Sequence, residues 1–267
     1  MPINLDPYFL HLPAWLLVLF RLSGIVVTAP LFGARAIPVR IRALWAVALS
    51  LCVYPMLLEV GRPARQLLMP ILSNGLGLWS IAPAVVAELL IGLIIGYGAG
   101  LPMIGMQVSG RIVDQQLGTA LGGVFNPDLD EQTAVFSEFY FLLALTAFVI
   151  LGGHRVMITT LVGSFDVIPL GGFRPDLTLL ELLIGMMGTI FNLAVCVAAP
   201  LLCLIFLETL AMGFIVRTVP QINVLSVGFP LRILLGIGLL IASLAIGARV
   251  FVEVAERVMS VLASYLG

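Results

Sequence analysis

Long apolar runs alternate with short polar segments along the whole chain. Six runs are each long enough to approach a bilayer core of about 30 Å at about 1.5 Å per helical residue. The first exceeds a signal-peptide core and has no clean cleavage site, so we expect it to be retained. The pattern predicts an all-α membrane-type fold of about six long helical stretches, with kinks and helical hairpins. These stretches cover residues 13–32, 41–58, 76–101, 134–151, 179–207 and 224–250.

Composition places the chain among membrane proteins. Its mean hydropathy is +1.18 and only 10% of its residues are charged, which gives more apolar surface than a soluble core of this size could bury. All thirteen basic residues are arginine, so chemistry that depends on lysine is excluded. Because the net charge is -1 and there is no basic run, we expect no nucleic-acid partner.

Four charged residues lie within the apolar runs or at their edges. An arginine such as Arg21 costs about 3 kcal/mol at a helix centre, whereas each large apolar residue returns about 0.3 to 0.6 kcal/mol. The first run has eleven such residues, so its insertion remains favourable if Arg21 faces protein or water. Each charge is either a buried structural partner or part of a pathway lining. The four residues are Arg21, Glu88, Glu208 and Arg232.

Arginines flank the second run on both sides. Arg35 and Arg40 precede it, Arg42 is its second residue, and Arg62 and Arg65 follow it. The positive-inside rule expects such an excess on one side only. Either the orientation is weakly biased, or some runs pack against other protein subunits and never cross a bilayer.

Glycines mark a helix-packing surface in the third run. Gly92, Gly96 and Gly100 recur at a spacing of four residues, which places them on one helix face. Small residues in such a stripe let helix backbones approach closely. We therefore expect close helix packing on this face.

A polar and glycine-rich segment, DQQLGTALGGVFNPDLDEQ, interrupts the apolar pattern at residues 114–132. Each of its glycines costs up to about 1 kcal/mol in a helix relative to alanine, so either packing holds the segment or it is a loop. Asn126 and Pro127 indicate a turn. The acids Asp128, Asp130 and Glu131 then lie near the start of the next stretch, where the helix dipole favours negative charge; contact with a substrate is the alternative role for them.

Searches for catalytic constellations give no candidate. The chain has no H-E-x-x-H or G-x-S-x-G motif, and His11 and His154 have no acidic or cysteine companion nearby in the sequence. We therefore expect no enzyme, no catalytic residue, no cofactor and no metal. A small-solute secondary transporter remains an alternative, but the internal repeat typical of many transporters is not visible.

Three segments together resemble one family. They are RLSGIVVTAPLFGARAIPVRIRALWAVALSLCVYP near the N-terminus, the central region from DQQLGTALGG to GSFDVIPLGG, and PQINVLSVGFPLRILLGIGLL toward the C-terminus. In this order they are similar to the FliR family, the export-gate subunits of flagellar and virulence type III secretion systems. The resemblance covers nearly the whole chain, so we expect one export-gate domain over residues 1–267.

The resemblance implies a role in protein export. It predicts a subunit of the flagellar export gate in the bacterial inner membrane, at the flagellar basal body. FliP and FliQ would be its partners in a heteromeric helical assembly, and the FlhB export component a further one. Unfolded secreted proteins would pass through the channel, with membrane lipid around the complex. The equivalent subunit of a virulence system is the alternative.

The same resemblance assigns the central segment to a channel plug. In the family, the corresponding loop projects into the channel and helps to close it. Glycines there allow close packing and easy rearrangement, as a gate that must open requires. The residues assigned to the plug are Gln116, Leu117, Gly118, Leu121, Gly122, Gly123, Val124, Phe125, Asn126 and Pro127.

Overall fold

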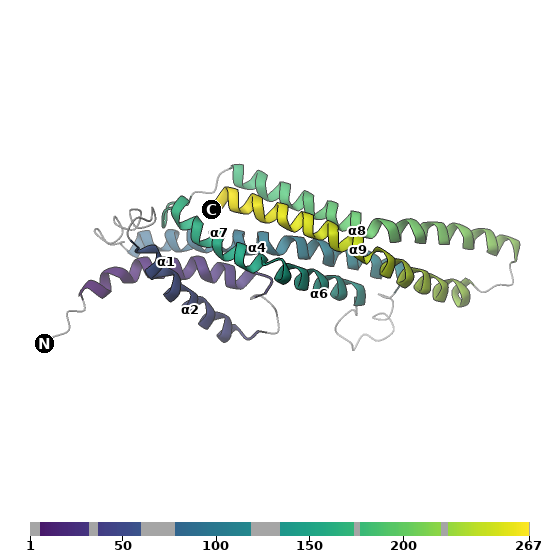
Figure 1. Ribbon diagram of the computed structural model, residues 1–267, viewed down its shortest axis with the longest axis horizontal. Helices are drawn as coiled ribbons and strands as arrows, with labels where there is room; N and C mark the ends of the chain where they lie inside the picture. The colour runs from purple at the N-terminus through teal and green to yellow at the C-terminus, as the bar shows by residue number, and fades with distance from the viewer. Residues whose placement is uncertain are drawn as a thin grey trace. The chain divides into compact units, whose positions relative to one another are not determined.

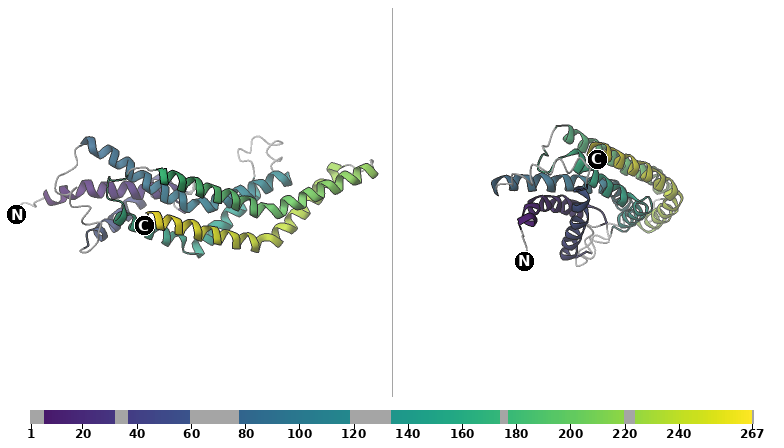
Figure 2. Two further views of the ribbon diagram at one scale, coloured as in Figure 1. Left: turned by 90° about the horizontal axis from the view of Figure 1, so that it is seen from above. Right: turned by 60° about the vertical axis from the view of Figure 1, so that its left-hand side comes forward.

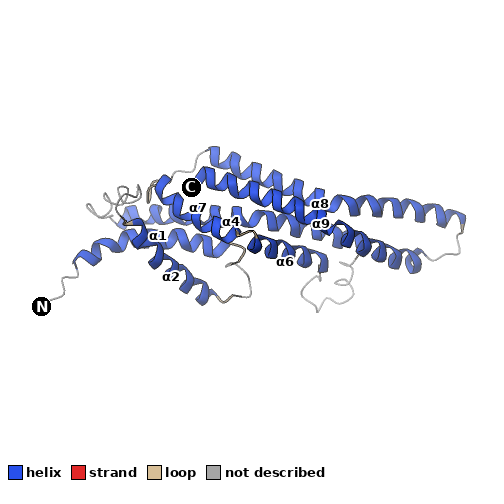
Figure 3. Ribbon diagram, viewed as in Figure 1, coloured by secondary structure: helices blue, strands red, loops and turns tan. Residues whose placement is uncertain are grey.

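The computed structural model describes residues 6–31, 37–59, 78–118, 134–173, 177–219 and 224–266. Within these ranges every regular element is a helix (Figure 3), which confirms the all-α prediction. The order along the chain (Figure 1) is α1 (Asp6–Thr28), α2 (Val39–Leu57), α4 (Leu78–Leu117), α6 (Val135–Ile150), α7 (Gly153–Val167), α8 (Leu177–Thr218) and α9 (Val224–Leu266).

Each predicted stretch overlaps one helix, but α1 begins at Asp6, before the predicted start, and three helices extend well past their predicted C-terminal ends. α4 continues beyond residue 101 to Leu117, α8 continues beyond residue 207 to Thr218, and α9 continues beyond residue 250 to Leu266. The apolar runs stop where polar side chains become frequent. The helix itself need not end there, because its backbone hydrogen bonds are made within the helix whatever the side chains are.

The helix α7 was not among the predicted stretches. It follows α6 after a break at Gly152, whose φ of 71° is left-handed. Glycine adopts this conformation without steric cost, whereas a right-handed helix cannot continue through it. The axes of α6 and α7 consequently differ by 65°.

Length and hydropathy fit a membrane protein. Five of the described helices, α1, α2, α4, α8 and α9, are long and apolar enough to cross a bilayer, and α6 with α7 would make a sixth span if the bent pair crosses as one. These spans bear out the membrane-type prediction.

Two compact units make up the structure. The first comprises Met1–Gly100, Leu151–Ile184 and Arg257–Gly267, and the second comprises Leu101–Ile150 and Gly185–Glu256. The single domain expected from the sequence stays a prediction.

In the first unit, α1 is packed against both α4 and α7. Fully or almost fully buried side chains come from all three helices, which therefore form one core. These side chains include Leu17, Leu22, Ile91, Ile95, Leu161 and Phe165.

In the second unit, the segments 185–218 of α8 and 224–256 of α9 run antiparallel and side by side (Figures 1 and 2). We call this pair the α8–α9 hairpin. Many of its large apolar side chains remain exposed, among them Phe206, Leu207, Phe214, Leu234, Ile241 and Ile246. Because exposed apolar surface of this extent is unfavourable in water, the hairpin requires lipid or partner helices around it.

Candidate functional site

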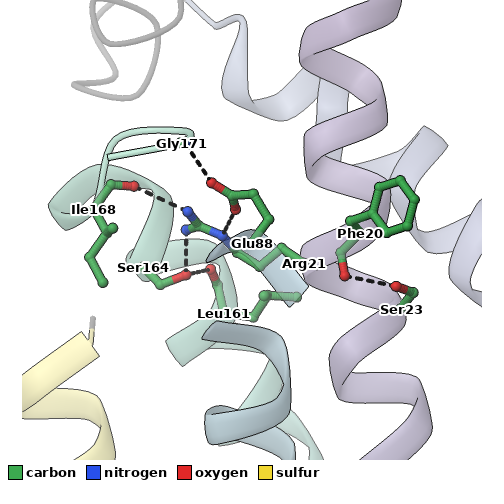
Figure 4. Close-up of polar contacts among 8 residues, drawn as sticks. All are labelled: Phe20, Arg21, Ser23, Glu88, Leu161, Ser164, Ile168 and Gly171. Carbon is green, nitrogen blue, oxygen red and sulfur yellow. Dashed lines mark hydrogen bonds and ion pairs between the residues drawn. The ribbon is translucent and has the colours of Figure 1, made fainter. Parts of the chain in front are cut away.

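A buried arginine of the first unit makes several polar contacts, which Figure 4 shows. Arg21 of α1 is completely buried, and its Nε donates to Glu88 Oε2 of α4 at 2.5 Å. Its Nη1 donates to Ser164 Oγ at 3.0 Å and its Nη2 to the Ile168 carbonyl at 3.3 Å. The guanidinium carbon lies 4.2 Å from the centroid of the Phe165 ring. The cation thus has both a counter-charge and further polar partners.

Glu88 extends this network to the turn after α7. Its Oε1 accepts a hydrogen bond from the Gly171 backbone N–H at 2.7 Å (Figure 4), and its side chain is also completely buried. The ion pair therefore links α1, α4 and the end of α7. Since both charges have direct protein partners, the geometry favours the structural-partner alternative for Arg21 and Glu88.

The predicted glycine stripe lies against α1 of the same chain. A Cβ atom at Gly92 would collide with the Arg21 carbonyl oxygen, and one at Gly96 with the Thr28 hydroxyl. At Gly100 it would lie 3.7 Å from Pro30 Cδ, an ordinary contact. Close backbone approach therefore requires glycine at Gly92, whereas at Gly96 the nearest backbone atoms would lie 3.1 Å away and at Gly100 the contact is ordinary.

The opposite surface of this contact is Gly24 of α1, which the sequence did not single out. A Cβ atom there would lie 2.5 Å from the Leu89 carbonyl oxygen and 2.8 Å from the Leu93 nitrogen. Gly24 has no glycine at helical spacing within its own run, so no stripe marked it.

The second pair of predicted charges meets in the α8–α9 hairpin. Arg232 donates from Nε and Nη2 to Glu208 Oε2, at 3.0 Å and 2.8 Å, and its Nη2 also lies 2.9 Å from Thr209 Oγ1. The Arg232 side chain is 31% exposed, whereas that of Glu208 is 4% exposed. This pair is open to its surroundings on the arginine side.

A groove of about 420 Å³ borders the Glu208–Arg232 pair. Its walls come from the C-terminal part of α8 and the N-terminal part of α9, and most of its lining is apolar. The lining residues are Glu208, Thr209, Met212, Gly213, Val216, Gly228, Phe229 and Arg232.

A third polar centre joins α4 to the start of α6, and sequence reasoning missed it. Asp114, which is 2% exposed, accepts hydrogen bonds from the Phe136 N–H at 3.2 Å and the Ser137 N–H at 2.9 Å. Ser137 Oγ donates in turn to the Gln107 carbonyl at 3.1 Å. We call Gln107, Gly110, Asp114, Phe136 and Ser137 the α4–α6 junction.

The predicted plug residues fall mostly outside the described ranges. Gln116 is exposed near the end of α4, Leu117 is completely buried, and Gly118 ends the helix with a φ of 74°. The following residues of the predicted plug lie outside the part of the chain that the structure describes: Leu121, Gly122, Gly123, Val124, Phe125, Asn126 and Pro127. The acids Asp128, Asp130 and Glu131 lie outside it as well.

Leu117 anchors the end of α4 in the second unit. A Cβ atom at Gly236 of α9 would collide with the Leu117 side chain, so the leucine fills the space beside that glycine. The last turn of α4, which contains the predicted plug residue Leu117, is therefore packed against the α8–α9 hairpin.

The histidines and acids do not form a metal site in the described ranges. His11 Nδ1 lies 2.7 Å from the Tyr54 hydroxyl, which joins α1 to α2. Among residues that the structure describes, no three His, Cys, Asp or Glu side chains lie together in a way that could hold a metal ion.

Comparisons with known proteins agree over almost the whole chain. The family described as Bacterial export proteins, family 1, matches residues 12–258. The flagellar biosynthetic protein FliR of Caulobacter vibrioides is 30% identical over 237 residues, covering 89% of this chain and 90% of that protein. The proteins of the same name from Bacillus subtilis and Escherichia coli are 28% and 26% identical, covering 88% and 93% of this chain and 87% and 90% of their own lengths.

Proposed function

Because this chain belongs to the family of bacterial export proteins, family 1, we propose that it is a structural and gating subunit of the flagellar type III protein export gate. Together with FliP and FliQ subunits it forms the channel through which unfolded flagellar proteins leave the cytoplasm. The relatives reported above bear flagellar names, which supports a flagellar over a virulence system. The complex lies in the inner membrane at the flagellar basal body, where the FlhB export component is a further partner.

The α8–α9 hairpin is the observation that carries the partner assignment. Of the apolar window in α9, 17% is buried by the chain itself, against 61% of the window in α4. The remaining apolar surface must be covered by lipid or by other helices. Arg40 and Arg42 in the first turn of α2, together with Arg62 and Arg65 after it, put arginines on both sides of a candidate span, which favours protein neighbours over a simple bilayer crossing.

Residues 116–127 form the gating part of this proposal. The described chain on both sides of residues 119–133 belongs to well-packed helices: Leu117, the second residue of the proposed segment, is buried at the end of α4, and Tyr140 is buried within the first two turns of α6. A segment fixed at both ends can occupy a channel without leaving it. The three glycines within it favour rearrangement when substrate arrives.

The family is named for export and not for catalysis, so the proposed role is that of a channel component and not of an enzyme. Its energy would come from other parts of the export apparatus. The two compact units would act together as one export-gate domain in this assembly.

Ion conductance of the assembled complex tests the gating role. Deletion of residues 118–125 should leave the complex assembled, because the deleted segment begins after the last buried residue of α4. The deletion complex in a planar bilayer should conduct ions at rest, whereas the wild-type complex should not. Normal assembly with an unchanged resting conductance would count against the plug.

A further inference from the structure

The start of α6 is capped by a side chain from another helix. The first N–H groups of a helix have no partner within it and need an acceptor from elsewhere. A side chain just before the helix usually supplies this acceptor. Here Asp114 of α4 supplies it, since its two carboxylate oxygens accept from the N–H groups of Phe136 and Ser137.

Three further contacts hold α6 against α4 at this place. Ser137 Oγ donates to the Gln107 carbonyl at 3.1 Å. A Cβ atom at Gly110 would lie 2.5 Å from the Phe136 carbonyl oxygen and from Ser137 Cα, so the two backbones are nearly in contact. Asp114 and Ser137 are 2% and 3% exposed. The α4–α6 junction is therefore a buried and specific contact within the second unit.

Charge and burial indicate why an aspartate stands at this position. A buried carboxylate is costly without hydrogen-bond donors, and here it receives two backbone N–H groups. The positive end of the α6 dipole also favours its negative charge. An asparagine would keep one oxygen acceptor but lose the charge and present an NH₂ group to the second N–H.

The Asp114 cap joins two helix ends that lie on either side of residues 119–133. Asp114 lies just before the C-terminal end of α4, and Phe136 and Ser137 lie in the first turn of α6. The carboxylate therefore joins the helix that ends before residues 119–133 to the helix that begins after them. We propose that Asp114 is a positioning residue that fixes the end of α4 and the start of α6, the two described helix ends on either side of the proposed plug segment, relative to each other. This inference rests on the gating role proposed above.

The first test is local and does not depend on gating. In the purified wild-type complex and in variants, hydrogen exchange is measured on peptides that cover the start of α6. Asp114→Ala should speed exchange of the first-turn amides by about fivefold to thirtyfold, which corresponds to the loss of a helix cap. Asp114→Asn should give a smaller increase. Glu181→Ala, at an exposed position near the start of α8, is the matched control and should leave exchange at α6 unchanged.

The second test is the resting conductance of the same complexes in a planar bilayer. Asp114→Ala should conduct at rest, although to a smaller extent than the deletion of residues 118–125, and Glu181→Ala should not. If Asp114→Ala prevents assembly, Asp114→Asn replaces it and should show the same changes in weaker form.

The outcomes separate the two proposals. Unchanged exchange at α6 in both Asp114 variants would overturn the cap itself. Faster exchange with a tight channel, while the deletion complex leaks, would overturn the positioning role and leave the plug intact. A tight channel in the deletion complex as well would overturn the gating role and this inference together. Faster exchange with a leak in both complexes supports them.

Discussion

Arg21 of α1 and Glu88 of α4 lie 67 residues apart in the chain and form an ion pair in which neither side chain is exposed. The pair joins two candidate membrane helices and reaches α7 through Ser164. Such a pair is a weak source of net stability, because desolvation offsets the attraction, but removal of one partner leaves a buried charge.

Removal of one partner of the Arg21–Glu88 pair should therefore cost more stability than replacement of both partners by apolar residues. Arg21→Met and Glu88→Met should each lower the free energy of unfolding by about 3 to 5 kcal/mol, and the double variant by less than the sum of the two. Unfolding by SDS in mixed micelles measures these differences. Arg249→Met, at an exposed position of α9, is the control and should change stability by less than about 0.5 kcal/mol. Strictly additive losses in the double variant would show that the pair is not coupled.

Substitution by alanine should destabilise the protein at a closely packed glycine but not at a glycine with open space beside it. Gly92→Ala adds a methyl group that would collide with the Arg21 carbonyl oxygen and lie 3.0 Å from Gly24 Cα. Overpacking of this kind costs about 1 to 3 kcal/mol, which exceeds the gain of up to about 1 kcal/mol in helix propensity. Gly188→Ala gains the same propensity and meets no atom within 4 Å.

Thermal unfolding of the purified chain in detergent decides this comparison. Gly92→Ala should lower the midpoint, and Gly188→Ala should leave it unchanged or raise it. A lower midpoint for Gly188→Ala than for Gly92→Ala would contradict the close contact between α1 and α4.

The Glu208–Arg232 pair should be asymmetric, because its two partners differ in exposure. Arg232→Met removes the arginine hydrogen-bond donors from the Glu208 carboxylate, which is 4% exposed. A buried charged acceptor without these donors should lower the free energy of unfolding by more than about 1 to 3 kcal/mol. Glu208→Gln leaves an arginine that is 31% exposed and keeps the Thr209 hydroxyl as an acceptor, so it should cost less stability than Arg232→Met. Equal losses of stability in SDS unfolding would refute this asymmetry.

Apolar periodicity was sufficient to predict the fold class and the place of six helices, because a run of this length has one stable conformation in lipid. It could not predict α7. The sequence of α7 mixes His154, Arg155 and Asp166 with apolar residues, so no long apolar run marks it. The break at Gly152 depends on a left-handed backbone, which one glycine among many does not reveal.

The candidate sites were partly visible in the sequence. Four charges stood out because each is expensive in an apolar run. The pairing of these charges did not stand out in the sequence, because Arg21 and Glu88 are brought together only by the packing of α1 on α4. The acids directly before α6 were expected only to interact with its dipole, whereas the cap itself comes from Asp114 of α4. A cap from a distant helix leaves no local pattern.

The central claim is that the exposed apolar faces of this chain are covered by other subunits around a channel. Its most direct test is purification of the tagged full-length chain from its native membrane in mild detergent, followed by native mass spectrometry. We expect a complex in which the chain is bound to FliP and FliQ. A stable, folded chain that is recovered alone, with only detergent and lipid on the α8–α9 hairpin, would contradict the claim.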